Sequence, residues 1–268
     1  MEQLKNQVEE YYNQHISDED RRLDYNIFEL PLTLKYIRKY VRKGARILDI
    51  ACGTGRYAGI LLDMGYKMAL NDIASKNVEL VERRFAGNKN VIMIEQSDAL
   101  RSNIWERSNW DAILMLGPLY HIINENNRLY LLKRSKEALA KNGYLFSAFM
   151  SRVQAMIYGI KHNAYGILDN SGSRQLWETG TDKTFVEGTE WFKHTYFAFP
   201  EEIDPLIERA GLKPLHLIGI EGLFGERMDL FHQLDPRLKT SWMNFIFRHC
   251  EETHMINQSK HLLSISTK

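Results

Sequence analysis

The sequence predicts an α/β protein with a doubly wound sheet. Strand-like and helix-like runs alternate from Arg46 onward, as they do in sheets built from parallel strands and crossover helices. The first strand-like run is apolar at Ile47, Leu48 and Ile50, which is typical of a parallel strand buried on both faces. The chain has 268 residues, enough for one large domain with additional segments over its ligand-binding edge.

Each element of this fold has its own signal. Strands are predicted, in chain order, at residues 46–50, 67–71, 91–94, 111–116, 144–150, 213–220 and 261–267. Helices are predicted at residues 56–64, 75–86, 125–141 and 200–210, with a short helix within 98–108. A glycine follows each of the four longer helices, at positions 65, 87, 143 and 211, where it can end a helix. Pro200, followed by Glu201 and Glu202, is typical of a helix start.

Three segments lie outside the alternation and are predicted to decorate a single domain of residues 1–268. Residues 1–43 carry apolar side chains at helical spacing from Leu4 to Tyr12, a capping box from Ser17 to Asp20, and a helix that Pro31 opens. Residues 151–198 are rich in aromatic side chains and weakly periodic, and we interpret them as a cap between the cofactor-binding half (44–150) and the C-terminal part of the sheet (199–268). Residues 221–260 form a further insertion.

Composition excludes several classes of protein. Hydrophobic residues make up 44% and charged residues 26% of the chain, as in globular proteins, and the net charge is +1 with Lys and Arg scattered, so no nucleic-acid partner is expected. Cys52 and Cys250 are the only cysteines, which argues against a disulfide framework and a zinc site made of cysteine pairs; no metal is expected. The polar N-terminus and the lack of a long apolar run predict a cytoplasmic protein without a membrane partner.

A glycine-rich turn follows the first predicted strand. Residues 47–55 read Ile-Leu-Asp-Ile-Ala-Cys-Gly-Thr-Gly. Gly53 and Gly55 permit a tight turn and let a ligand lie against the backbone at the start of a helix. A turn that binds pyrophosphate should not carry the Asp49 carboxylate beside it, but a turn that binds a cationic ligand can. Gly59 completes a G-x-G-x-x-x-G spacing, which fits a dinucleotide-binding turn only loosely.

This turn resembles motif I of the class I S-adenosylmethionine-dependent methyltransferases. Ala51 stands where the family has its first glycine, and we interpret the change as mild because the position needs a small side chain more than left-handed geometry. The order of the predicted elements also resembles that family's core, whose last strand is antiparallel. The resemblance implies a Rossmann-like mixed sheet with helices on both faces and S-adenosylmethionine as cofactor, with S-adenosylhomocysteine as product.

Acidic residues end the next two predicted strands. Asp72 is placed to accept hydrogen bonds from ribose hydroxyls, or alternatively to cap the following helix. Asp98 matches the family's acceptor for the adenine amino group, or alternatively forms a turn. Neighbouring apolar side chains suit the two faces of adenine. The implied cofactor-binding residues are Asp49, Ala51, Cys52, Gly53, Gly55, Asp72, Ile73, Asp98, Ala99, Leu116 and Gly117, with Tyr12 and Arg22 from an N-terminal helix that resembles the family's lid.

The fourth predicted strand ends in Leu-Gly-Pro-Leu-Tyr-His, from Leu116 to His121. This string resembles a branch of mostly small-molecule methyltransferases, and the Asn or Asp before Pro-Pro-Tyr of nucleobase-modifying branches is missing. Tyr120 and His121 are therefore the catalytic candidates; alternatively, His121 caps or packs on the following helix. The acceptor-binding candidates are Tyr120, His121, Trp177, His194 and Tyr196. Arg22 either meets the methionine carboxylate of the cofactor or is an exposed arginine on a helix face.

These observations predict transfer of a methyl group to a nitrogen, oxygen or other nucleophile of a small, partly apolar acceptor, either a metabolite or a peptide-derived compound. Alignment of acceptor, methyl and sulfur supplies much of the rate, and a base is needed only when the acceptor carries a proton. An RNA or protein methyltransferase and a non-catalytic S-adenosylmethionine-binding module are the alternatives. A monomer or homodimer is expected.

Overall fold

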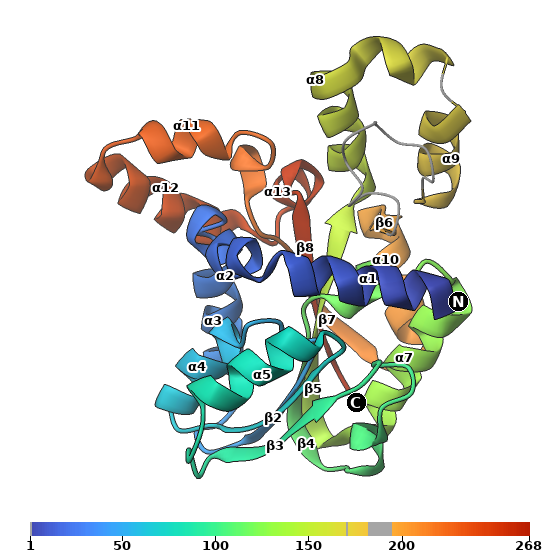
Figure 1. The fold of residues 1–268 in the computed structure, drawn as a ribbon. Helices are drawn as coiled ribbons and strands as arrows, with labels where there is room; N and C mark the ends of the chain where they lie inside the picture. The colour runs from blue at the N-terminus through green and yellow to red at the C-terminus, as the bar shows by residue number, and fades with distance from the viewer. Residues whose placement is uncertain (1, 170, 182–194) are drawn as a thin grey trace.

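The computed structural model describes residues 2–169, 171–181 and 195–268. A mixed sheet in the order β3-β2-β1-β4-β5-β8-β7 runs through it (Figure 1). Its strands are β1 (Arg46–Ile50), β2 (Lys67–Asp72), β3 (Val91–Gln96), β4 (Trp110–Met115), β5 (Leu139–Ser151), β7 (Lys213–Gly219) and β8 (His261–Thr267), with the short β6 (Phe197–Ala198) paired to β5. Strand β8 is antiparallel to both of its neighbours. The predicted fold class is confirmed, including the antiparallel last strand.

Helices cover both faces of the sheet because both faces of its central strand are apolar. On one face lie α3 (Glu29–Tyr40), α4 (Arg56–Asp63) and α5 (Ser75–Arg84); on the other lie α7 (Glu125–Ala138) and α10 (Pro200–Arg209) (Figure 1). Two hydrophobic cores result, one on each face of the sheet. Ile47 of β1 belongs to the core beneath α3, α4 and α5, and Leu48 and Ile50 belong to the core beneath α7 and α10. The connection after β3 contains the 3-10 helix η1 (Asn103–Glu106).

The predicted boundary between α7 and β5 is wrong. The sequence predicts a helix to residue 141 that Gly143 ends, whereas α7 ends at Ala138 and β5 begins at Leu139. Gly143 lies inside β5, next to a register shift in the pairing with β4. A Cβ atom at this position would lie 2.8 Å from the carbonyl oxygen of Trp110. The glycine therefore permits close approach of two strands and does not stop the helix.

The N-terminal segment forms α1 (Glu2–Gln14) and α2 (Ile16–Tyr25), and α1 lies across the carboxyl-terminal edge of the parallel strands (Figure 1). The predicted capping box is wrong, since Ser17 lies inside α2 and the N-cap is His15. The His15 ring stacks on Tyr11 and bonds to its carbonyl oxygen, directly after α1 ends at Gln14, three residues before the predicted cap.

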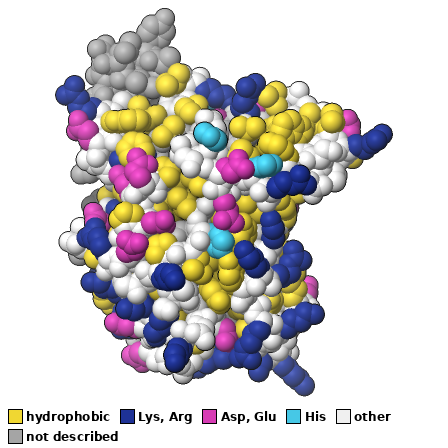
Figure 2. Space-filling view, turned by 180° about the vertical axis from the view of Figure 1, so that it is seen from behind, with side chains coloured by type: hydrophobic (Ala, Val, Ile, Leu, Met, Phe, Trp, Pro, Cys, Tyr) yellow, Lys and Arg dark blue, Asp and Glu magenta, His cyan; other side chains and the backbone are white. Residues whose placement is uncertain are grey.

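The described residues of the two other decorations are largely helical. Residues 151–198 contain α8 (Arg152–Asp169) and α9 (Ser171–Thr179), whose helical character the weak periodicity did not reveal. Residues 221–260 contain η3 (Gly222–Phe224), α11 (Met228–Gln233), α12 (Pro236–His249) and α13 (Thr253–Gln258). Helices α11 and α12 project from the sheet as an arm, and hydrophobic side chains gather on it in the view from behind (Figure 2). None of the helices in the described ranges is both long and apolar enough to cross a membrane.

Candidate active site

A cavity of about 1150 Å³ lies at the carboxyl-terminal edge of the parallel strands, beneath α1 and α2. Residues from the ends of β1 and β2, the turn after β3, the segment 116–130 and the two N-terminal helices line it. Ligands of doubly wound sheets bind at this edge. The volume exceeds the range of about 300–1,000 Å³ that is usual for one small ligand, so the cavity has room for a cofactor and an acceptor together.

The glycine-rich turn after β1 forms one wall of the cavity. Ala51, Gly53 and Gly55 all have left-handed backbone conformations, with φ of 58°, 55° and 78°. The interpretation that Ala51 needs a small side chain more than left-handed geometry is therefore wrong, because the position does adopt left-handed geometry. Alanine pays for this geometry in conformational energy, as residues with a Cβ atom rarely adopt it.

Asp49 is a buried carboxyl group without a hydrogen-bond partner at its Oδ2 atom among the described residues. Burial, with the charge of Asp72 as a second contribution, raises the pKa of Asp49 to about 8. A cationic ligand in the cavity would favour the ionised form and remove this cost. The orphaned oxygen thus fits the positively charged cofactor that the sequence implies.

Asp72 holds the turn and the start of α5 together. Its Oδ2 atom accepts a hydrogen bond from the Gly53 amide at 2.7 Å, and its Oδ1 atom accepts from the Ala74 amide at 2.9 Å and from the Asn77 side chain at 3.2 Å. The N-cap of α5 is Ala74, so the alternative that Asp72 is the helix cap is wrong in that form. Asp72 is nonetheless buried, and the desolvation raises its pKa.

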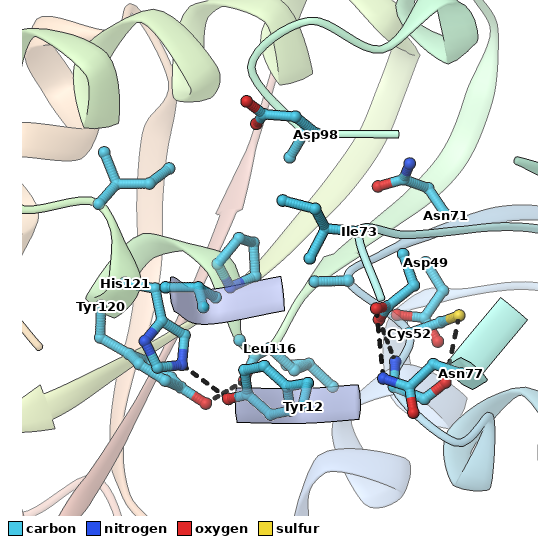
Figure 3. A pocket seen from close by; sticks show the side chains of 18 of the residues that line it. Tyr12, Asp49, Cys52, Asn71, Ile73, Asn77, Asp98, Leu116, Tyr120 and His121 are labelled. Atoms are coloured by element: carbon cyan, nitrogen blue, oxygen red, sulfur yellow. Dashed lines mark hydrogen bonds between the residues drawn. The ribbon is translucent and has the colours of Figure 1, made fainter. Parts of the chain in front are cut away.

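Asp98 and Ala99, in the turn after β3, and Ile73, directly after β2, line the cavity. Figure 3 shows Asp98 and Ile73. The Oδ1 atom of Asp98 accepts a hydrogen bond from the Leu100 amide at 2.9 Å, so the alternative role of Asp98 in a turn is present. The same carboxylate lines the cavity, and its contact with the adenine amino group stays a prediction.

Tyr120 and His121 lie in the short helix α6 (Pro118–His121), across the cavity from Asp49 (Figure 3). The Tyr12 hydroxyl, from α1, is 2.7 Å from His121 Nε2, and the two rings meet edge to face. Tyr120 donates a hydrogen bond of 3.4 Å to the Leu116 carbonyl. The cap of α7 is Asn124, so the alternative that His121 caps this helix is wrong.

Arg22 from α2 lines the cavity, but its Nη1 and Nη2 atoms donate to Glu29 at 2.6 and 3.2 Å. Burial opposes ionisation of Glu29, yet the charges of Arg22 and His261 and the hydrogen bond from Arg22 hold the pKa of Glu29 below its ordinary value. Arg22 is therefore not simply an exposed helix-face arginine, and a contact with the cofactor stays a prediction.

The predicted acceptor-binding residues do not all gather at the cavity. Trp177 is 51% exposed and packs edge to face against Phe199. Tyr196 is buried below the cavity wall, where its hydroxyl donates to Glu202 at 2.9 Å. Neither side chain lines the cavity. His194 lies outside the described residues.

Sequence reasoning missed several polar residues of this edge. Glu29, Asn71, Asn77 and Ser97 line the cavity. His261 lies at the same edge because β8 is antiparallel and begins opposite Met150, near the end of β5. The sequence signal that could have located His261 was the expected antiparallel direction of the last strand. Within the described part of the chain, no cluster of three or more His, Cys, Asp or Glu side chains could hold a metal ion.

Most of the residues around this cavity lie in a stretch that matches a family of known proteins. Residues 47–143 match the family model described as a methyltransferase domain. This stretch of the chain is therefore similar to a methyltransferase domain. It contains the glycine-rich turn, the three acids and the α6 residues of the cavity, and the match supports an S-adenosylmethionine-dependent methyltransferase as the enzyme class and S-adenosylmethionine as its cofactor.

Two curated methyltransferases match parts of the chain. The chain is 25% identical over 134 residues to a ubiquinone biosynthesis O-methyltransferase of Pelagibacter ubique, covering 46% of this chain and 54% of the relative. It is 31% identical over 71 residues to a ribosomal protein L11 methyltransferase of Thermotoga neapolitana, covering 26% of each. The matched parts thus span about half or less of these curated relatives.

A solved structure resembles the fold over nearly the whole chain. It is a 1,6-didemethyltoxoflavin-N1-methyltransferase of Burkholderia thailandensis, with bound 1,6-didemethyltoxoflavin and S-adenosylhomocysteine. The TM-score is 0.59 at 12% identity, covering 97% of this chain and 87% of that one. At this identity the likeness shows the fold alone.

Proposed function

We propose that this protein transfers a methyl group from S-adenosylmethionine to a nitrogen, oxygen or other nucleophile of a small, partly apolar acceptor, a metabolite or a peptide-derived compound. The observation that carries the proposal is a single cavity with buried acids at one end and Tyr120 and His121 at the other. We further expect a cytoplasmic monomer or homodimer that binds no nucleic acid.

The chain's own residues fit the cofactor. Asp72 fixes the glycine-rich turn against which the methionine part would lie, and the unpartnered Asp49 oxygen favours a cation nearby. Ile73 and Ala99 suit the faces of adenine, and Asp98 would accept from its amino group. When bound, the cofactor supplies an electrophilic methyl on a positively charged sulfur, so the protein needs mainly to align the acceptor with it.

The other end of the cavity would hold the acceptor. Tyr120 and His121 point polar groups into an otherwise largely apolar wall, and Tyr12 fixes the His121 ring by its hydrogen bond. Because Tyr12 already bonds to His121 Nε2, we assign His121 mainly to orienting the acceptor. Helix α1 covers the cavity and would exclude water during the transfer.

An RNA or protein acceptor is the second candidate, and the match to a ribosomal protein L11 methyltransferase is the observation that favours it. A macromolecular side chain would have to pass α1, so this function requires the helix to move. A non-catalytic binding module is the third candidate, since the acids and glycines of the turn serve binding only.

A methyl-release assay separates these candidates. Purified protein is incubated with methyl-labelled S-adenosylmethionine and, in turn, a metabolite panel of phenols, amines and carboxylic acids, small peptides, total RNA and cell protein. Label in a small acceptor supports the proposal, and label only in RNA or protein supports the second candidate. Binding of S-adenosylhomocysteine in calorimetry without transfer to any acceptor would identify a binding module.

A further inference from the structure

A buried histidine and glutamate form a pair beside the cavity, outside the residues that the proposed function uses. Glu221 follows β7 and is 1% exposed, and His261 begins β8 and is 9% exposed. The Glu221 Oε2 atom accepts hydrogen bonds from the backbone amides of Lys260 and His261, at 3.0 and 2.9 Å. Its Oε1 atom accepts from Nδ1 of the His261 ring.

This arrangement fixes the ring and its protonation. A carboxylate that accepts from Nδ1–H selects the tautomer in which Nε2 carries a lone pair, as in catalytic dyads of histidine and a carboxylate. No hydrogen bond to Nε2 is found among the described residues. The three donors lower the free-energy cost of burying the Glu221 carboxylate. Nε2 of His261, by contrast, makes no hydrogen bond to any residue that the structure describes that would stabilise the fold.

The ring borders a recess of about 10 Å³, at the lower limit for one water molecule. Arg22, Glu29, Leu116 and Tyr120 line both this recess and the large cavity, so the recess adjoins the cavity. Glu29 and His261 line the same recess, so the ring lies near that carboxylate.

We propose that His261, oriented by Glu221, takes the proton of a protic acceptor through one water molecule in this recess. The acceptor's oxygen or nitrogen forms its bond to the methyl carbon, the carbon–sulfur bond breaks, and its electron pair stays on sulfur. The acceptor's proton passes to the water, whose own proton passes to Nε2, and the resulting imidazolium stays bonded to Glu221. The inference rests on the proposed function and supplies the base that His121, already bonded to Tyr12, does not.

The charged and titratable groups around His261 come from several elements. They are Glu221 after β7, Glu29 in α3, Arg22 in α2, Tyr120 in α6 and the neighbouring ion pair of Lys260 with Glu226. Glu29 and Arg22 pair with each other, so a positive charge that forms on His261 is balanced chiefly by Glu221.

His261→Asn tests the proposal with the fold preserved, because the asparagine amide can still donate to Glu221 where Nδ1 did, while Nε2 is lost. With an acceptor found in the panel, turnover near pH 7 should fall at least about 100-fold, and the loss should shrink as pH rises and the acceptor ionises unaided. His254→Asn, at an exposed histidine of α13, is the matched control and should behave as the wild type. A loss that is equal at every pH would mean that the pair only clamps β7 to β8, and would overturn the proposal.

Nuclear magnetic resonance gives a readout that needs no acceptor. In protein labelled with ¹⁵N-histidine and saturated with S-adenosylhomocysteine, His261 is assigned by its absence from His261→Asn. Near pH 8 we expect a proton on Nδ1 and none on Nε2, and in Glu221→Gln the Nδ1 proton should move upfield because the charged acceptor is gone. Two ring protons throughout the accessible pH range would overturn the proposal. Methyl transfer that His261→Asn leaves unchanged would refute this inference alone, whereas absence of binding and transfer in the wild type would refute the proposed function.

Discussion

Asp49 is a residue whose ionisation opposes folding. Its pKa in the folded chain is about 8, against an ordinary value of 3.8. At pH values between these two, the unfolded chain has lost this proton and the folded chain still holds it. The folded state then binds more protons than the unfolded state, so the contribution of Asp49 to stability falls as pH rises through this window.

Asp49→Asn should therefore raise the melting temperature of the ligand-free protein near pH 8. The gain should shrink towards pH 4, where the wild-type carboxyl is protonated in both states, and this comparison is the internal control. The same variant should bind S-adenosylhomocysteine at least about 10-fold more weakly, since a charged partner is lost. Thermal scans over pH and calorimetry measure both effects, and a variant that melts lower than wild type near pH 8 would contradict the assignment.

Ala51 carries a left-handed backbone conformation that glycine adopts without strain. Ala51→Gly should stabilise the protein by up to about 1 kcal/mol, because relief of about 1–2 kcal/mol of strain exceeds the greater entropy of glycine in the unfolded chain. Urea unfolding measures the change. Ala74→Gly is the control: its φ is −77°, so glycine relieves no strain there, and the loss of a buried methyl group and the entropic cost should destabilise the variant.

His121 and Tyr12 join α6 to α1 through one hydrogen bond. His121→Ala should lower turnover about 100-fold while cofactor affinity changes little, because the side chain lies at the acceptor end of the cavity. Tyr12→Phe should give a smaller loss, since the ring contact remains. Single-turnover kinetics with the identified acceptor, together with calorimetry, measure both. Normal turnover in His121→Ala with lowered thermal stability would show a packing role.

At the scale of elements, the strands and turns of the cofactor half could be predicted because their signals are local. A continuous apolar run marks β1, and the glycines and acids after it define the turn. Gly143 misled the prediction because a glycine can end a helix or admit a neighbouring strand, and only the proximity of Trp110 distinguishes the two. The candidate pair of Glu221 and His261 depends on contacts between residues 40 positions apart, which no local pattern encodes.

Helix α2 is joined to α4 and α5 by two ion pairs, in addition to its buried Leu23. Asp24 pairs with Arg56 at 2.6 Å and Asp20 with Arg84 at 2.9 Å, all with partly exposed side chains. Exposed ion pairs of this kind stabilise a contact only weakly, so they should do little to keep the two helices from opening.

Hydrogen exchange should therefore be faster in residues 2–25 of the ligand-free protein than in its complex with S-adenosylhomocysteine. Arg84→Ala should increase the exchange of this segment further, while α10 on the opposite face serves as the unaffected control. Equal protection of Tyr11 and Tyr12 in both states would mean that the helices are permanently docked.

At the scale of the whole molecule, the two cores on either side of the sheet leave one edge for function. Parallel strands bring their carboxyl ends to this edge, and the reversed β8 brings its first residue there. Acids that are unfavourable for folding, a strained alanine and an unpartnered ring nitrogen all gather at the same edge. Such local conflicts with stability are expected where a fold carries a ligand site.

Filling the cavity should stabilise the entire chain, because a ligand that binds only the folded state shifts the unfolding equilibrium by mass action. At a concentration 100 times its Kd, S-adenosylhomocysteine should add about 2.7 kcal/mol. For a chain of this size that corresponds to a rise in melting temperature of about 5–10 °C. NAD should give no rise, since Asp49 lies beside the turn that would have to receive its pyrophosphate, and the glycine spacing there does not fit a dinucleotide. Stabilisation by NAD without any response to S-adenosylhomocysteine would contradict both the proposed function and the assignment of this turn.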